Sequence, residues 1–166
     1  TRLNELSFAR RAAESLLLAI RHHLQPGARC LDFGAGFGHL VDTLLKAGLQ
    51  AAAFEPSAGR RESILAQFAG RPGFLGVVGL EHDEHYDVVF ALEVVEHILE
   101  KQFDTTLAAM ARFLAPDGLL VLTTPNGEDL DLGGCICPNC GTLFHRWQHV
   151  RSFTPDSLAA ALRPHG

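Results

Sequence analysis

The chain has neither the long apolar run of a membrane protein nor the excess positive charge of a nucleic-acid-binding protein. No stretch approaches the roughly 18 consecutive apolar residues of a membrane span. The formal net charge is −5 and the pI is about 5.9, so the sequence offers no general basic surface to a polyanion. We therefore expect no membrane span and no nucleic-acid partner.

A targeting signal and an initiator methionine are also missing at the start, Thr1-Arg2-Leu3. Without a signal pattern we expect a cytoplasmic protein, and we expect the chain to be an excerpt of a longer one. Its 166 residues are 47% hydrophobic and 20% charged, which describes one soluble globular domain over residues 1–166. Nothing in the composition indicates an oligomeric state.

The chain is organised around a glycine-rich turn. An apolar run ends in Asp32, and Gly34, Gly36 and Gly38 follow at alternate positions before an amphipathic segment. This order predicts a strand, a tight turn and a helix whose free N–H groups face a ligand. The dinucleotide fingerprint has its third glycine one position later, where His39 stands, so the spacing argues against NAD. A carboxylate at the strand end also favours a ligand with a cationic group.

The segment LDFGAGFG resembles motif I of the class I S-adenosylmethionine (SAM)-dependent methyltransferases. Glu55 adds a second part of this signature. It follows a short apolar strand about 20 residues after the glycine turn, where nucleotide-binding folds place an acid on the ribose hydroxyls. The resemblance implies that SAM is the cofactor and that it is bound by Asp32, Gly34, Gly36, Gly38 and Glu55.

The strand expected at residues 74–78 ends at Gly79 and Leu80. In the resembled family the adenine lies at this strand end, so the resemblance implies that these two residues contact it. The family usually has an acid at this position. Here the nearest acid is Glu81, and the match is weaker at this site.

The segment DVVFALEVVEHI resembles motif IV of small-molecule methyltransferases, especially the quinone O-methyltransferase group. In that group the Glu-x-x-Glu-His segment borders both the cofactor and the acceptor, which implies a cofactor contact for Glu93. His97 is then a candidate catalytic base, with Glu96 or Glu93 orienting its imidazole. His149 is the competing candidate. Farther along, FLAPDGLLVLTTPN resembles the fifth strand of the same fold.

Methyl transfer from a sulfonium requires the protein to position the acceptor and to remove its proton. We therefore expect transfer to a small-molecule acceptor, on a hydroxyl oxygen, with Arg146 and Arg151 as candidates to hold an anionic acceptor. Two alternatives stay open. One is an NAD-linked dehydrogenase, which would use the same glycine turn and Glu55. The other is a SAM-fold module that binds without catalysis.

Strands and helices alternate along the chain without a repeat. The pattern predicts an α/β fold: a doubly wound, mostly parallel sheet with helices on both faces, the Rossmann-like methyltransferase fold. The family's sheet normally has two further strands, which we do not expect here. A leading helix ends at Gln25-Pro26-Gly27, and its apolar positions are Leu6, Ala9, Ala13, Leu16, Leu17, Ile20 and Leu24. Further helices are expected at 39–47, 57–69, 101–114 and 158–162, and strands at 50–54, 74–78, 86–91 and 119–124.

Residues 125–152 break the alternation and predict an inserted loop over the cleft, rich in cysteine and histidine. Cys137 and Cys140 have the two-residue gap and trailing glycine of a zinc knuckle. A structural zinc would be bound by Cys135, Cys137, Cys140 and His145, with His149 as a substitute ligand. A redox dithiol and free thiols are the alternatives. The fourth cysteine, Cys30, is expected to pack in the core.

Overall fold

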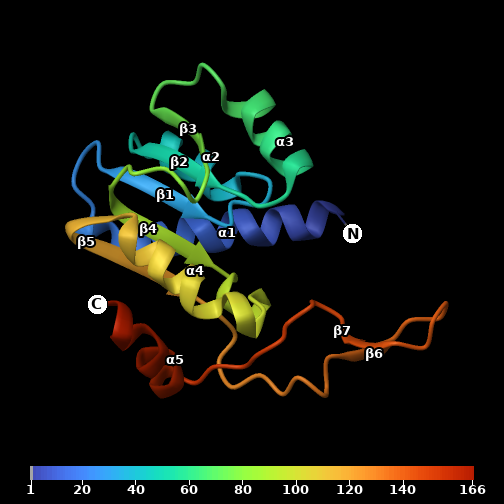
Figure 1. Cartoon of the computed structure of the whole chain (residues 1–166). Coiled ribbons are helices and arrows are strands. Elements are labelled where there is room, and N and C mark those ends of the chain that lie inside the picture. Colours follow the sequence, from blue (N-terminus) through green and yellow to red (C-terminus); the bar gives the residue numbers. More distant parts are fainter. Residues whose placement is uncertain (1) are drawn as a thin grey trace.

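A five-stranded parallel sheet forms the centre of the molecule (Figure 1). The computed structural model describes the backbone of residues 2–166 and the side chains from residue 11 onward. The strand order is β3-β2-β1-β4-β5. The strands are β1 (Arg29–Phe33), β2 (Gln50–Phe54), β3 (Phe74–Val78), β4 (Tyr86–Leu92) and β5 (Leu114–Thr123). The doubly wound α/β fold predicted from the sequence is confirmed.

The strand order reverses between β1 and β4. The chain first runs outward from β1 to β3, then returns to pair β4 with the other side of β1 and adds β5 beyond it. In such sheets the loops after neighbouring strands diverge at this point and leave a crevice at the carboxyl ends. The topology therefore places the ligand site at the ends of β1 and β4. No strand follows β5 at its edge of the sheet within the described residues.

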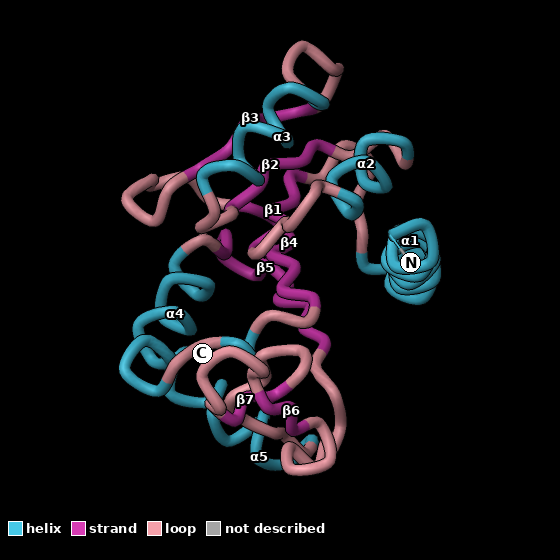
Figure 2. The backbone as a smooth tube through the Cα atoms, turned by 90° about the vertical axis from the view of Figure 1, so that its right-hand side faces the viewer, coloured by secondary structure: helices cyan, strands magenta, loops and turns pink. Residues whose placement is uncertain are grey.

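Helices cover both faces of the sheet, and Figure 2 shows α1 and α2 on one side and α4 on the other. The first core lies against α1, α2 and α3 and includes Val41, Ile64 and Phe68. The second core lies against α4 and α5 and includes Leu107 and Met110. The helices are α1 (Arg2–Ile20), α2 (His39–Lys46), α3 (Ala58–Phe68), α4 (Glu100–Arg112) and α5 (Pro155–Leu162). None of the helices in the described residues is long and apolar enough to cross a membrane.

Short local signals explain where these elements begin and end. Central strands buried on both faces need apolar side chains throughout, and β2 meets this need with three fully buried alanines. A capping box between Thr154 and Ser157 begins α5. A 3-10 turn, Arg21–His23, ends α1 just before the predicted stop. Ala13 is buried as predicted, whereas the side chains of Leu6 and Ala9 lie outside the described residues.

Two parts of the chain differ from the expectation. The residues between the expected helix (101–114) and the expected strand (119–124) lie inside β5, because Tyr86 pairs with Leu114 and Val88 already pairs with Leu119. The intervening residues form a bulge in which Asp117 has a φ of 62°. The loop 125–152 also contains an antiparallel hairpin, β6 (Gly134–Ile136) and β7 (Leu143–His145), which projects from the sheet in Figure 1.

Candidate cofactor and acceptor site

A cavity of about 580 Å³ lies at the carboxyl end of β1. Asp32 and the glycine turn form one wall, and Glu93 and Thr123, at the ends of β4 and β5, form another. The helix α1 closes the cavity with Ala12, Ala13 and Leu16, so this helix covers the sheet and borders the site. The volume is in the range of ordinary small-molecule sites. We call this space the cofactor cavity.

The three glycines of the turn have different roles. All three have positive φ values, which L side chains rarely adopt. A Cβ on Gly34 would lie 2.6 Å from Val94 Cγ2, and one on Gly38 would lie 2.5 Å from Phe68 Cε2. A Cβ on Gly36 would meet nothing within 4 Å. Gly34 and Gly38 therefore let the backbone pack closely, whereas Gly36 leaves open space for a ligand.

Asp32 is an acid in an unfavourable place for a charge. Its side chain is only 4% exposed. Burial raises its pKa to about 7; the backbone amide of Val41 offsets part of this effect, and the nearby charge of Glu55 adds to it. A cationic ligand in the cofactor cavity would favour the ionised form again. The residue is therefore suited to an amino or sulfonium group, as the sequence indicated.

Glu55 lies at the end of β2 and is also buried, with 3% exposed. Its Oε2 accepts a hydrogen bond from the N–H of Gly36 at 2.8 Å, and its Oε1 accepts one from the N–H of Ser57 at 2.9 Å. Arg60 lies 3.9 Å from Oε1. The carboxylate thus joins the glycine turn to the start of α3, and each oxygen keeps a lone pair for a further donor.

A second cavity of about 720 Å³ adjoins the first, and we call it the acceptor cleft. The two cavities share Gly34, Arg60 and Glu93 in their walls. His97 lines the acceptor cleft from the β4 side. The inserted loop closes it with Trp147 and Gln148, as predicted for a loop over the cleft.

The end of β3 differs in part from the expectation for an adenine contact. Leu80 lines the acceptor cleft and is 45% exposed. Gly79 lines neither cavity. Its N–H donates to Nδ1 of His82 at 2.8 Å, and the side chain of Glu81 folds over it. Only Leu80 of the predicted pair therefore faces the site.

Two residues beside the acceptor cleft have a strained backbone. Glu93 has a φ of 54° and Gln148 a φ of 61°. Left-handed backbone at residues other than glycine is uncommon and gathers at functional sites. At Gln148 this conformation directs the carbonyl oxygen to Nδ1 of His97, 3.3 Å away. A carbonyl only accepts, so this contact places the His97 proton on Nδ1 and leaves a lone pair on Nε2.

The two candidate bases lie side by side, at different depths. The ring centroids of His97 and His149 are 4.8 Å apart with nearly perpendicular planes. His97 lines the acceptor cleft, whereas His149 lies outside the lining and its side chain is 9% exposed. Behind both lies Glu96, 1% exposed, whose Oε1 has no hydrogen-bond partner and whose pKa is raised by burial. Thr124 donates to its other oxygen at 3.1 Å.

The inserted loop is joined to this histidine pair by its backbone. Val150 donates its N–H to the carbonyl of Glu96 at 2.8 Å. Arg151 donates to the carbonyl of Ile98 at 3.0 Å and covers the ring of Phe103 at 3.8 Å. Arg146 donates to a carbonyl within the loop. Both arginines therefore hold the loop in place, and neither lines the cleft where an anionic acceptor would lie.

The residues of the predicted zinc site do not gather in one place. Among the described residues, only two groups bring three candidate ligand atoms within 4.8 Å of one another: Glu96 with His97 and His149, and Glu128 with His145 and His149. Cys135, Cys137 and Cys140 belong to neither group. Hydrogen bonds between Cys140 and Thr142 lower the pKa of Cys140, and a hydrogen bond with Cys137 adds to this effect. Cys30 is fully buried in the core, as predicted.

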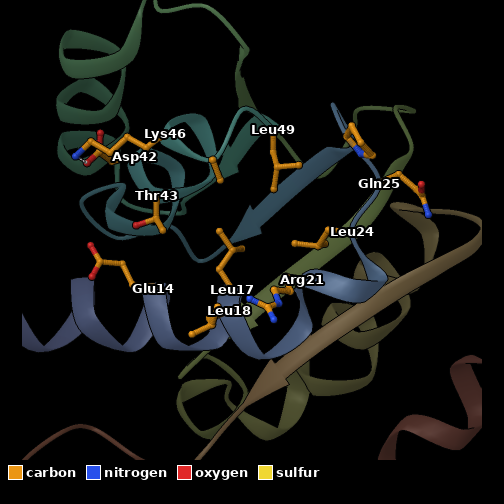
Figure 3. Close-up of a pocket in the computed structure, with 12 residues that line it drawn as sticks. Glu14, Leu17, Leu18, Arg21, Leu24, Gln25, Asp42, Thr43, Lys46 and Leu49 are labelled. Carbon is orange, nitrogen blue, oxygen red and sulfur yellow. Dashed lines mark hydrogen bonds and ion pairs between the residues drawn. The ribbon is translucent and has the colours of Figure 1, made fainter.

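A third cavity lies between α1 and α2 and shares no wall residue with the other two (Figure 3). Leu17, Leu24 and Leu49 give it an apolar floor, and the ion pair of Asp42 and Lys46 lies at its rim. It contains no strained residue and none of the predicted site residues. The cofactor cavity and the acceptor cleft, which contain predicted site residues, are therefore the candidate site.

A parallel sheet with this strand order, a glycine turn after β1 and an acid after β2 are features of the class I SAM-dependent methyltransferases. The comparison with known families agrees with this class. Residues 6–166 match a family model described as "Methyltransferase domain", so the chain belongs to this family.

Curated relatives resemble the chain over about three fifths of its length. A ubiquinone biosynthesis O-methyltransferase of Bradyrhizobium diazoefficiens is 32% identical over 105 residues, which are 60% of this chain and 41% of the relative. An uncharacterised methyltransferase of Geobacillus kaustophilus is 31% identical over 98 residues, 57% of this chain and 46% of the relative. The chain thus spans less than half the length of these relatives.

Solved structures share the fold. A SAM-dependent methyltransferase of Clostridium acetobutylicum has a TM-score of 0.71 at 11% identity, over 92% of this chain and 78% of that one. The 1,6-didemethyltoxoflavin-N1-methyltransferase of Burkholderia thailandensis has a TM-score of 0.67 at 24% identity, over 95% of this chain and 66% of that one. These similarities establish the arrangement of the sheet and helices.

Proposed function

We propose that the protein transfers a methyl group from SAM to a hydroxyl oxygen of a small molecule. The observation that carries the proposal is the wall shared by the two cavities. Gly34, Arg60 and Glu93 border both, so a donor in the cofactor cavity and an acceptor in the cleft would meet there. Methyl transfer needs this adjacency because the acceptor attacks the methyl carbon in line with the breaking bond.

The residues of the cofactor cavity fit SAM chemically. Asp32 supplies a carboxylate for a cationic group, and Gly36 leaves space beside the backbone. Glu55 lines the adjoining acceptor cleft, next to the shared residues Gly34 and Arg60, and supplies acceptors for ribose hydroxyls from that side. When bound, SAM would supply a methyl group activated by a positive sulfur. The structure of the Burkholderia thailandensis methyltransferase named above contains S-adenosylhomocysteine, which supports the same class of ligand for this protein.

We propose that His97 is the base that removes the proton from the acceptor hydroxyl. This residue lines the cleft, and its contact with the Gln148 carbonyl leaves Nε2 as the atom that can take a proton. Oxygen as the acceptor atom is favoured by the name of the Bradyrhizobium relative, a ubiquinone biosynthesis O-methyltransferase. The cysteines of the inserted loop remain a separate proposal for a structural zinc, in which Cys137 and Cys140 supply two thiolates.

The experiment that tests the proposal has two stages. Calorimetric titration of the purified protein with SAM and with NAD should show binding of SAM only. Incubation with methyl-labelled SAM and a panel of phenols, catechols, saccharides and amines should then transfer label to hydroxyl compounds. Binding of NAD instead would support a dehydrogenase and overturn the proposal. Label transferred only to amines would overturn the oxygen assignment, and SAM binding without any transfer would indicate a non-catalytic module.

A further inference from the structure

A carboxylate that no sequence motif indicates lies beside His149, one of the two candidate bases. The side chain of Glu128 is 23% exposed, and its Oε2 lies 2.5 Å from Nδ1 of His149. Its Oε1 lies 3.6 Å from Nε2 of His145. The rings of His145 and His149 stack with centroids 4.7 Å apart. One carboxylate thus faces a nitrogen of each of two nearly buried histidines.

The hydrogen bonds around this group determine where the protons are. The backbone N–H of His149 donates to Nδ1 of His145 at 3.2 Å, so that nitrogen carries the lone pair. In neutral His145 the proton is then on Nε2, the nitrogen that faces Glu128. An ionised Glu128 only accepts, so the short contact with His149 places a proton on Nδ1 of that residue as well.

This pattern fits protons better than a metal ion. A histidine that ligates a metal through one nitrogen carries its proton on the other, and the protein normally offers an acceptor there. For His145 the other nitrogen meets a backbone donor. A cation between Glu128 and His145 that held this ring through Nε2 would put a proton on Nδ1 and break this contact, whereas the proton arrangement keeps it and the short bond between Glu128 and His149.

We propose that Glu128 is a positioning residue of the acceptor site. Its carboxylate holds His149 in the tautomer with the proton on Nδ1 and leaves Nε2 of this ring, which lies next to the His97 ring, unprotonated. The edge-to-face contact of the two rings then fixes the orientation of His97, and the Gln148 carbonyl fixes its proton. The kinetic consequence of this arrangement rests on the proposed function; the tautomer of His149 does not.

The direct test is the proton position on His149. Long-range ¹H–¹⁵N spectra of protein with labelled histidine identify the protonated ring nitrogen, and the signal that disappears in His149→Ala assigns the residue. We expect the Nδ1–H form in the unmodified protein, less of it in Glu128→Gln, which keeps one acceptor oxygen, and least in Glu128→Leu. Asp129→Asn is the matched control, because it removes the same charge from the next residue, which is exposed.

Three results would overturn the proposal. The first is an Nε2–H form of His149 in the unmodified protein, a measurement that needs no variant to fold. The second is an unchanged tautomer in a folded Glu128→Leu protein. The third is about one equivalent of bound metal per chain that is lost in Glu128→Leu and kept in Cys137→Ser. This result would show that a cation joins Glu128 to the two histidines it faces.

A kinetic measurement separates this proposal from the proposed function. With an acceptor from the panel, Glu128→Leu should lower kcat and leave the KM for SAM unchanged. The loss of kcat should be smaller than the roughly 10²–10⁴-fold loss expected when a base is removed. Glu128→Asp should restore part of the rate. If no acceptor is methylated, the proposed function fails while the tautomer of His149 still decides the role of Glu128.

Discussion

Asp32, the proposed partner of the ligand's cationic group, should make the protein less stable as the pH rises. Its pKa increases from the ordinary 3.8 to about 7 on folding, first because of burial. The folded state therefore holds this proton more tightly than the unfolded state. The stabilising contribution of the protonated group is complete below pH 3.8 and is lost as the pH rises through about 7.

The size of the effect follows from the two pKa values. The whole shift corresponds to about 4 kcal/mol, of which about 2.5 kcal/mol is lost between roughly pH 5 and pH 8. Asp32→Asn removes the titration and keeps the shape of the side chain. The free energy of unfolding of the variant should therefore exceed that of the unmodified protein at pH 8, and the difference should shrink or reverse at pH 5.

Urea unfolding of both proteins over this pH range measures the difference directly. SAM affinity should move the opposite way, because an amide cannot neutralise a cationic ligand, and Asp32→Asn should bind SAM more weakly at pH 8. Parallel stability curves for the two proteins would refute the reasoning, since they would show that Asp32 has the same pKa in both states. Asp83→Asn, on an exposed loop, is the control for a simple loss of negative charge.

Further predictions concern the glycine turn, Glu55, the histidine pair and the cysteines. Gly38→Ala should destabilise the fold by about 1–3 kcal/mol in urea unfolding, because its Cβ meets Phe68 at 2.5 Å, whereas Gly36→Ala should mainly weaken SAM binding in calorimetry. Glu55→Ala should weaken SAM affinity by on the order of 2–4 kcal/mol, and unchanged affinity would remove Glu55 from the site. His97→Ala should lose roughly 10²–10⁴-fold in rate and His149→Ala less; two fully active variants would exclude base catalysis by either residue. Elemental analysis should return about one zinc per chain if the loop cysteines form a structural site, and freely reacting thiols with little zinc would rule that site out.

The sheet could be predicted from the sequence because its signals are local. The strands at residues 50–54 and 74–78 have the predicted bounds, since short apolar runs between glycine-containing turns have few other stable arrangements. The glycine turn and Glu55 could be located for the same reason, because both follow strands whose carboxyl ends meet at one edge of the sheet. Predictions of element bounds failed where the chain departs from the simple alternation of strands and helices. The bulge before residue 119 depends on pairing with β4, which local sequence does not encode.

The inserted loop was the hardest part to predict. The hairpin left a weak signal, since apolar residues flank the turn formers Pro138, Asn139 and Gly141. Spacing in sequence favoured His145 as a partner of the cysteines. In the structure this ring faces Glu128 instead, because the backbone of His149 holds its Nδ1. Sequence spacing cannot show this, since the contact depends on where the chain returns after the hairpin.

The loop and the sheet together determine the geometry of the acceptor site. A 3-10 turn, Val95–His97, follows β4 and exposes the His97 ring to the cleft, but nothing in that turn holds the ring nitrogens. The loop supplies the missing partners through the Gln148 carbonyl and the His149 ring, at the cost of a left-handed backbone at Gln148. Such strain persists only where neighbouring contacts outweigh it, and here the bond from Val150 to the Glu96 carbonyl comes two residues later. Under the proposed function, the loop therefore shapes the acceptor cleft, whereas the glycine turn and Asp32 shape the cofactor cavity.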